Sequence, residues 1–427
     1  MKKLLSISLL TGFAFALQFQ PLGFKSIGMG GAGVACASGS AAAYYNPALL
    51  AKHKYTTEIS ISAGIGAREI NLIDPIDKLA NQYDLSDTLD HIQNNAPISG
   101  SNTKSGDNVK IQNALKEIYR LSQGNGFELM PTAAVSIQIE NFALGVYGIG
   151  DVSANAHIDR DHLYLIFKDE DKGGYYYYYP NKDTYGATDE STYKKYSLKY
   201  ALDNNLTYIG VQGIGVAEVP LSFASTINLQ NVDVSLGINL KYIEGITYKN
   251  KLALDTDQDN LEESLNDNKK TSSDYGVDVG VLISKDAFRA GLVGKYLNSP
   301  TFKYYDGTTY KIKPMVRSGV AIDFNALTLG LDIDLTQNDT LIPNYKSQYI
   351  GGGFDLHQSW FSIRGGAMYN MLEDDEGLIV TAGLGFGLKW FQLDVAAEAA
   401  TKHGTYDGND VPRYFKVNLA LLSRWGG

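Results

Sequence analysis

An acidic stretch in the second half of the chain has the spacing with which proteins bind calcium. Asp255-x-Asp257-x-Asp259 begins like the loop of an EF-hand, in which carboxylates alternate with other residues. Such a loop needs glycine at its sixth position and glutamate at its twelfth, but these positions are Asn260 and Asn266. We therefore interpret the stretch as a solvated acidic loop, with a weak Ca²⁺ site as the alternative.

A second group of possible metal ligands lies in the first half of the chain. His157, Asp159, Asp161 and His162 are near neighbours in sequence and carry the side chains that bind zinc. A protein zinc site needs at least three ligands that converge in space, and sequence proximity alone does not provide this. We expect no metal site and no cofactor.

Two motifs resemble enzyme signatures but lack the required context. Residues 28–33, GMGGAG, spell the G-x-G-x-x-G dinucleotide fingerprint, yet they follow no strand and start no βαβ unit. We interpret them as a close-packed segment lined by glycine. His357-Gln358-Ser359 could supply a base and a nucleophile, but no nucleophile elbow surrounds the serine. The sequence therefore predicts no enzyme.

Five consecutive tyrosines, Tyr175 to Tyr179, precede Pro180 in a long polar segment. Such a run could form an apolar surface that captures a ligand. It could equally be a strand extension whose rings pack against neighbouring loops.

Composition limits the class of protein. The formal net charge of −10 disfavours nucleic acid as a partner, because phosphates attract a basic surface. The single cysteine, Cys36, rules out an intramolecular disulfide framework. No window holds the roughly 20 consecutive apolar residues that a membrane-spanning helix needs.

The start of the chain has the pattern of an export signal. Met1-Lys2-Lys3 is positively charged, residues 4–15 are apolar, and Ala14-Phe15-Ala16 is a small-x-small cleavage site. We expect residues 1–16 to be a signal peptide and the mature chain to begin at Leu17.

The elements that must position these residues are strands. From Val232 to Tyr242 every second residue is apolar, and the residues between are polar or glycine. This period of two indicates a strand with one apolar face. It recurs along the chain in pairs joined by tiny connections, and longer connections separate the pairs. One of the long connections, residues 68–129, contains near-helical spacing over residues 109–121.

Six short turns and seven long connections alternate, and they require fourteen strands. The predicted strands are 55–67, 130–140, 142–158, 207–228, 232–250, 274–284, 287–297, 314–323, 326–336, 345–356, 359–370, 378–388, 390–400 and 413–425. We expect the strand 207–228 to bend near Val219-Pro220. Alternately short and long connections with an even strand count are typical of outer-membrane barrels, whose short turns are periplasmic. We therefore predict an all-β, transmembrane antiparallel barrel over residues 55–427, with both termini periplasmic and short helices in the external loops.

Charged residues within these strands should face the barrel interior, because a charge that faces lipid is costly. The lumen-facing charges that we predict are Asp233, Lys241, Asp332, Asp334 and Asp394.

The segment before the first strand carries a family resemblance. Residues 28–35, GMGGAGVA, and residues 42–50, AAYYNPALL, resemble the N-terminal hatch of the long-chain fatty-acid transporter (FadL-like) superfamily. Later elements look closest to the plasmid-transfer TraF-like outer-membrane proteins. These elements are residues 296–302, YLNSPTF, residues 348–354, QYIGGGF, and residues 378–386.

The resemblance implies that residues 17–54 form a hatch inside a fourteen-stranded barrel. It also implies that hydrophobic molecules pass from the lumen sideways into the membrane. Asn46 and Pro47 match the hatch motif, although an ordinary strand-entry turn would explain them as well. We expect an apolar pocket near the hatch that contains Tyr44, Tyr45 and Leu49.

Two functions remain open from the sequence. In the first, the barrel passes fatty-acid-like hydrophobic molecules through a hatch-gated lumen. In the second, it serves the assembly of a conjugation or secretion apparatus without transport, since one fold can host both. The expected surroundings are the lipid and lipopolysaccharide of a Gram-negative outer membrane, with a hydrophobic ligand or apparatus proteins as partners.

Overall fold

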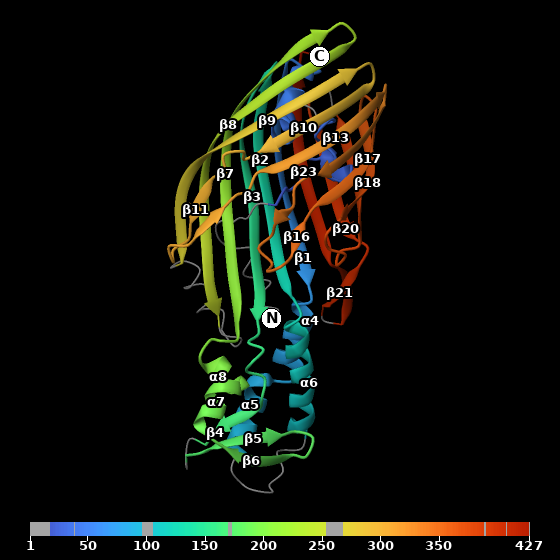
Figure 1. Cartoon of the computed structure of the whole chain (residues 1–427). Coiled ribbons are helices and arrows are strands. Elements are labelled where there is room, and N and C mark those ends of the chain that lie inside the picture. Colours follow the sequence, from blue (N-terminus) through green and yellow to red (C-terminus); the bar gives the residue numbers. More distant parts are fainter. Residues whose placement is uncertain are drawn as a thin grey trace.

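The residues that alternate between apolar and polar types form strands, and fourteen of these strands close into one antiparallel barrel (Figure 1). The computed structural model describes residues 18–37, 39–95, 106–169, 173–252, 268–387, 390–406 and 408–426. The predicted signal peptide, 1–16, and the acidic loop with Asp255, Asp257 and Asp259 lie outside them. The barrel strands are β1 (Thr57–Ile70), β2 (Gly126–Ile139), β3 (Phe142–His157), β7 (Tyr208–Leu229), β8 (Val232–Leu252), β9 (Lys269–Lys285), β10 (Phe288–Lys295), β13 (Met315–Phe324), β14 (Leu327–Asp334), β17 (Tyr349–His357), β18 (Phe361–Asn370), β19 (Leu378–Gly387), β20 (Gln392–Ala400) and β23 (Tyr414–Trp425).

The predicted fourteen-stranded barrel is confirmed, and each predicted strand corresponds to one observed strand. Each strand pairs with the next, and β1 closes the barrel against β23, with Thr57 opposite Trp425. The largest shift is in β9, which begins at Lys269 rather than at residue 274, and β17 begins only at Tyr349 because Lys346 and Ser347 belong to a separate hairpin. The strand expected to bend near Val219-Pro220 runs unbroken as β7.

The short turns reverse the chain through left-handed backbone conformations. Glu140, Gln230, Asp286 and Asn325 have φ between 41° and 50°, the region that two-residue hairpins require. We call this end of the barrel the short-turn end and the opposite end the long-loop end.

The outer wall of the barrel is apolar. In β8 the side chains of Leu236, Ile238 and Leu240 are exposed. Asn239 and Lys241, which alternate with them along the strand, are buried in the lumen. A closed barrel pairs the backbone groups of neighbouring strands with one another, and an apolar outer face suits lipid. Among the described helices, none combines the length and the apolar character needed to cross a membrane.

Two long loops build a separate body beyond the long-loop end, which we call the distal unit (described residues 71–95, 106–125, 158–169 and 173–207; Figure 1). The predicted helix at 109–121 is confirmed as α6 (Asp107–Leu121). Its apolar side packs with those of its neighbours around Ile92, Ile118 and Phe167. The other elements of the unit are α4 (Ile73–Asp77), the π-helix η3 (Lys78–Gln82), α5 (Leu85–Asn95), β4 (Ile166–Lys168), β5 (Tyr175–Tyr179), β6 (Thr184–Thr188), α7 (Glu190–Tyr196) and α8 (Leu198–Asp203).

Shorter loops form two-stranded hairpins at the long-loop end. Phe302 of one hairpin is buried against Gly245 of β8, where an added Cβ would lie 2.3 Å from its ring. Gln212 of β7 donates a hydrogen bond to the carbonyl of Leu341 in another (2.6 Å). Two hairpins therefore fold inward over the lumen. The hairpins are β11 (Thr301–Lys303) with β12 (Thr309–Lys311), β15 (Asn338–Asp339) with β16 (Lys346–Ser347), and β21 (His403–Tyr406) with β22 (Asn409–Pro412).

Residues 18–53, which we call the N-terminal segment, run through the lumen before β1 begins. Gln18 lies near the long-loop end, where its amide donates to Glu128 of β2 (3.2 Å). Trp425 lies at the short-turn end beside the start of β1. The two ends of the described chain are therefore at opposite ends of the barrel. The even strand count predicted one side for both, but it did not include this passage through the lumen.

Candidate functional site in the barrel lumen

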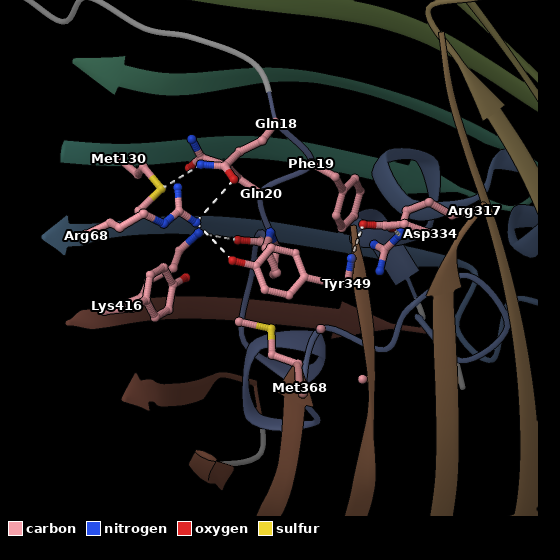
Figure 2. Close-up of a pocket in the computed structure, with 15 residues that line it drawn as sticks. Gln18, Phe19, Gln20, Arg68, Met130, Arg317, Asp334, Tyr349, Met368 and Lys416 are labelled. Atoms are coloured by element: carbon pink, nitrogen blue, oxygen red, sulfur yellow. Dashed lines mark hydrogen bonds and ion pairs between the residues drawn. The ribbon is translucent and has the colours of Figure 1, made fainter. Parts of the chain in front are cut away.

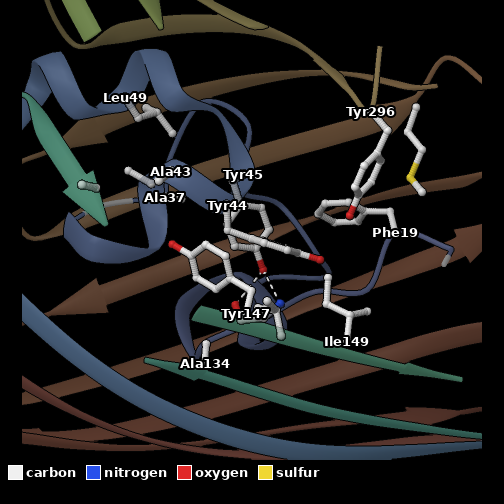
Figure 3. Close-up of a cluster of buried hydrophobic side chains, with 14 of the residues drawn as sticks. Phe19, Ala37, Ala43, Tyr44, Tyr45, Leu49, Ala134, Tyr147, Ile149 and Tyr296 are labelled. Carbon is white, nitrogen blue, oxygen red and sulfur yellow. Dashed lines mark hydrogen bonds between the residues drawn. The ribbon is translucent and has the colours of Figure 1, made fainter. Parts of the chain in front are cut away.

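The N-terminal segment fills the centre of the barrel with short helical turns and buried side chains. Its elements are α2 (Lys25–Gly28), η1 (Gly39–Ala41), α3 (Ala42–Tyr45) and η2 (Pro47–Lys52). Figure 3 shows Phe19, Tyr44 and Tyr45 gathered beside Tyr147 and Ile149, which point inward from β3. The N-terminal segment thus supplies Phe19, Tyr44 and Tyr45 to one apolar cluster, and β3 supplies Tyr147 and Ile149 to the same cluster.

Tyr44 and Tyr45 are held by hydrogen bonds as well as by packing. The Tyr44 hydroxyl donates to the carbonyl of Gln20 (2.7 Å), and the Tyr45 hydroxyl donates to the carbonyl of Leu22 (2.8 Å). The Tyr45 ring lies directly over Gly33, where an added Cβ would approach it to 2.2 Å. Both rings therefore fix the fold of the segment itself.

Asn46 and Pro47 form a turn that is pressed against the barrel wall. The Asn46 amide donates to the carbonyls of Val34 (3.0 Å) and Val281 (3.2 Å), and its oxygen accepts from the N–H of Ala48 (3.0 Å). Pro47 then begins η2 with its fixed φ. A Cβ at Gly280 of β9 would lie 1.9 Å from the Asn46 oxygen, so glycine is required there.

The glycine run at residues 28–33 packs against the opposite wall. Gly30 has φ of 65°, and an added Cβ would lie 2.3 Å from the carbonyl oxygen of Ala367 in β18. The Asp332 carboxylate of β14 accepts hydrogen bonds from the N–H groups of Gly33 (2.8 Å) and Val34 (2.9 Å). This segment therefore approaches the barrel backbone closely and is anchored by one carboxylate.

Four of the predicted lumen charges are buried and paired with opposite charges. Lys241 lies between Glu218 (3.0 Å) and Asp278 (2.8 Å). Asp334 contacts Arg317 (2.6 Å), which is also 3.9 Å from Asp332, and Asp394 pairs with Arg364. The fifth, Asp233, is half-exposed at the short-turn rim, where it pairs with Lys52 of the N-terminal segment (2.6 Å).

Arg68 of β1 is the centre of a buried network that the sequence did not identify. It pairs with Glu128 and with Glu376 (2.6 Å) and donates to the Tyr349 hydroxyl (3.0 Å). The predicted strand ended at residue 67, so the sequence assigned Arg68 to a long connection, and its partner Glu376 comes from a loop 308 residues away. Only the closure of the barrel brings these two side chains together.

Removing this guanidinium should destabilise the barrel strongly. Arg68→Ala would leave Glu128 and Glu376 buried without a counter-ion, which costs about 3–5 kcal/mol. We expect the temperature at which the barrel unfolds, read from its mobility shift on unboiled gels, to fall clearly. Lys249→Ala, which removes a half-exposed pair with Asp306 (3.0 Å), should change that temperature little. Equal effects of the two variants would contradict this account.

Two buried lysines hold the N-terminal segment through backbone carbonyls. Lys295 of β10 donates to the carbonyl of Tyr44 (2.8 Å) and lies over the Tyr44 ring (3.6 Å to its centroid). Lys416 of β23 donates to the carbonyl of Pro21 (2.8 Å). For both ammonium groups no carboxylate of the described residues lies within ion-pair distance. An anionic group that replaced these carbonyls would therefore bind more strongly than they do.

A small cavity remains between the N-terminal segment and the wall (Figure 2). Its volume of about 20 Å³ holds little more than one water molecule. Polar side chains line much of it, including Gln18, Arg68, Arg317 and Lys416. The expected apolar pocket around Tyr44, Tyr45 and Leu49 is not this cavity, because those side chains are packed into the apolar cluster. The packing of Phe19 against both tyrosine rings explains the difference.

Pairing between the described barrel strands is interrupted at two places, which we call ladder gaps, and both flank β3. Pairing of β3 with β2 skips the stretch opposite Met130-Pro131, and pairing with β7 skips the stretch opposite Val219-Pro220. A proline lies at each gap, and proline has no N–H group to donate to a ladder. Between the two gaps, β3 presents Tyr147 and Ile149 to the lumen. The strand whose pairing is interrupted on both edges is therefore the one that contacts Tyr44 (5.3 Å between the Tyr44 and Tyr147 ring centroids).

The other sequence candidates lie outside the lumen. His162 contacts Asp159 (3.1 Å) in the distal unit, and no group of three metal-binding side chains converges among the described residues. Tyr175–Tyr179 form the middle strand of a three-stranded sheet, β4-β5-β6. His357 ends β17, 3.7 Å from Asp355.

Comparison with known proteins identifies a family. The model of the family described as "F plasmid transfer operon, TraF, protein" matches residues 43–334, which confirms the TraF-like resemblance. A search of curated protein sequences finds no match.

Solved structures that resemble this chain include two toluene transporters and a FadL homologue. They include the Ralstonia pickettii toluene transporter TbuX, with 14% identity and a TM-score of 0.46 over 95% of this chain and 99% of that one. The P. putida toluene transporter TodX has 10% identity and a TM-score of 0.49 over 96% and 100%. A Pseudomonas aeruginosa FadL homologue has 10% identity and a TM-score of 0.48 over 97% and 100%.

Proposed function

This chain belongs to the family described as "F plasmid transfer operon, TraF, protein", and because that description names an operon and no activity, we propose a function from the lumen. We propose that the protein is an outer-membrane barrel that passes hydrophobic small molecules through a lumen gated by the N-terminal segment. In this proposal the short turns and the C-terminal end face the periplasm, and the distal unit lies outside the cell. The apolar outer wall contacts lipid and lipopolysaccharide.

The observation that carries this proposal is the interrupted pairing on both edges of β3, next to the apolar cluster. Tyr147 and Ile149 line the lumen between the two ladder gaps, and Phe19 and Tyr44 occupy the space in front of them. A hydrophobic molecule that replaced those two rings would bury the same apolar surface. Separation of β3 from β7 or β2 at a gap would then let it leave sideways into the membrane.

The basic groups of the lumen add a preference among hydrophobic ligands. Lys295 and Lys416 would lose their carbonyl partners when the N-terminal segment moves. A carboxylate on the ligand would satisfy these buried ammonium groups better than a neutral hydrocarbon could. The proposal therefore favours a fatty-acid-like molecule over toluene.

Restoring the missing ladder bonds tests lateral exit. The double variant Pro131→Thr with Pro220→Thr adds a backbone N–H at each gap. Because one hydrogen bond contributes about 1 kcal/mol, opening at either gap should become harder and uptake should fall about fivefold. The measurement is uptake of radiolabelled oleic acid and of toluene by cells that lack their own channels for these compounds. Pro412→Thr, in a hairpin outside the barrel ladder, is the matched control.

The outcomes separate the parts of the proposal. Normal uptake by the double proline variant would overturn lateral exit at β3. Absence of uptake by the wild-type protein would overturn transport altogether. That second result, together with a transfer or secretion protein that copurifies in fixed proportion, would establish the alternative function as an assembly protein.

A further inference from the structure

The distal unit carries a cleft on its surface that the proposed transport does not use. Asp161, His162, Ser191, Lys194, Lys195 and Tyr196 line this cleft. His162 is fixed on both sides of its ring, by Asp159 (3.1 Å) and by the carbonyl of Lys194 (3.0 Å). The cleft is therefore lined by polar groups of both charges on a supported framework.

A row of tyrosine rings leads from the sheet of the distal unit into this cleft. Ring centroids follow one another from Tyr179 to Tyr177 (6.0 Å), from Tyr177 to Tyr164 (6.3 Å) and from Tyr164 to Tyr196 (5.8 Å). Tyr164 is 57% exposed and Tyr179 is 47% exposed. Tyr178, which precedes Tyr179 in β5 and therefore points to the opposite face of the sheet, is buried. Because Tyr196 belongs to both the row and the cleft, the two form one surface.

The composition of this surface distinguishes its ligand from the ligand of the lumen. Its apolar members are all tyrosines, which carry an apolar face and a polar tip. The aliphatic and phenylalanine side chains of the same elements, such as Ile166, Phe167 and Leu198, are buried in the core of the unit. A surface for hydrocarbons would expose those side chains. Flat rings beside carboxylate, imidazole and ammonium groups suit a molecule with apolar faces and many hydroxyls, which is a sugar.

The cleft also provides a positive charge for such a ligand. The Lys195 ammonium lies over the Tyr196 ring (5.0 Å to its centroid). Within the described residues no carboxylate is in ion-pair contact with it, whereas Lys194 pairs with Glu190 (2.7 Å). The hydrogen bond with Tyr196 raises the pKa of Lys195, so this group stays charged at neutral pH. An acidic substituent on the sugar would find its counter-ion here.

We propose that the cleft and the tyrosine row together form a binding site for an oligosaccharide that bears acidic groups. The sugar rings would lie on Tyr164 and Tyr177, and a phosphate or carboxylate would contact Lys195. This site is independent of the lumen, so that its failure would leave the transport proposal untouched.

Calorimetry with a matched pair of oligosaccharides tests the site. The full-length protein is kept in lauryl dimethylamine oxide, because a sugar detergent would compete. The probes are the deacylated core oligosaccharide of lipopolysaccharide with its phosphates and the same oligosaccharide after their removal. We expect the phosphorylated form to bind, and the dephosphorylated form to bind about tenfold more weakly.

Variants assign the binding to the named residues. Tyr164→Ala and Tyr177→Ala should each weaken binding about tenfold, whereas Tyr164→Phe, which keeps the ring, should bind like the wild type. Tyr119→Ala is the matched control, because Tyr119 is 62% exposed on α6 but outside the row. Lys195→Met should weaken binding of the phosphorylated probe only.

Two results would overturn the proposal. One is the absence of binding of the phosphorylated oligosaccharide by the wild-type protein. The other is an equal loss of affinity in Tyr119→Ala and Tyr164→Ala, with each variant shown by its circular dichroism spectrum to be folded. An unchanged affinity in Lys195→Met would refute the part assigned to the acidic group.

Discussion

We expect a single cysteine introduced at Gly330 to stop the proposed transport in the oxidised protein, and a reducing agent to restore it. Gly330 lies on the inner face of β14 beside the N-terminal segment. A Cβ added there would be 3.0 Å from the sulfur of Cys36 and 3.4 Å from the Cβ of Ala32. These distances suit a disulfide with an S–S bond of about 2.05 Å, so Gly330→Cys should pair with the native Cys36. The bond would tie the segment to the wall.

The expected effect of this bond is large because a covalent bond prevents the segment from leaving the wall for as long as it is intact. Uptake of oleic acid should therefore fall to background. Gly330→Ser, which has nearly the same size, and Gly330→Cys in a Cys36→Ala background are the matched controls. Uptake that persists in a sample shown by mass spectrometry to be fully cross-linked would mean that the segment does not move during transport.

The opposite change, loss of an anchor, should open the lumen. Asp332 accepts the N–H groups of Gly33 and Val34, and it is almost completely buried. Asp332→Ala would leave both donors unpaired and would take one carboxylate from Arg317, at a cost of about 3–5 kcal/mol. Because the ladder of β14 does not use this side chain, the barrel should still form while the segment detaches. The measurement is ion conductance in planar lipid bilayers, which should rise clearly above that of the wild type.

Graded variants show whether the carboxylate itself is the cause. Asp332→Asn keeps one acceptor oxygen and should give an intermediate conductance. Asp233→Ala removes the half-exposed pair with Lys52 at the rim and should change stability by no more than about 1 kcal/mol, with little change in conductance. A closed and stable Asp332→Ala protein would show that the glycine run is held by packing alone.

The wall of this protein could be predicted from its sequence because strand alternation is a local signal. The inward placement of Lys241 and Asp332 followed from the cost of a charge in lipid. Their partners could not be predicted, because Glu218 and Asp278 reach Lys241 from two different strands and only the register of those strands sets the distance. The same applies to Arg68 and Glu376, which closure brings together.

The interior of the N-terminal segment was less accessible to sequence reasoning. Its small residues indicated close packing, but they did not show that Phe19 would pack against Tyr44 and Tyr45. In the distal unit the helical period of residues 109–121 was readable. The sheet β4-β5-β6 was not, because Tyr175 to Tyr179 carry no alternation of residue type.

The contact between β1 and β23 also has a consequence for assembly. The N-terminal segment lies inside a ring that closes where β1 pairs with β23. Several of its anchors, such as the bonds from Lys416 to Pro21 and from Asn418 to Gly23, come from β23 itself. The segment must therefore already be in position when β23 pairs with β1. The barrel therefore closes around the N-terminal segment, and a segment that was outside the barrel at closure would remain outside.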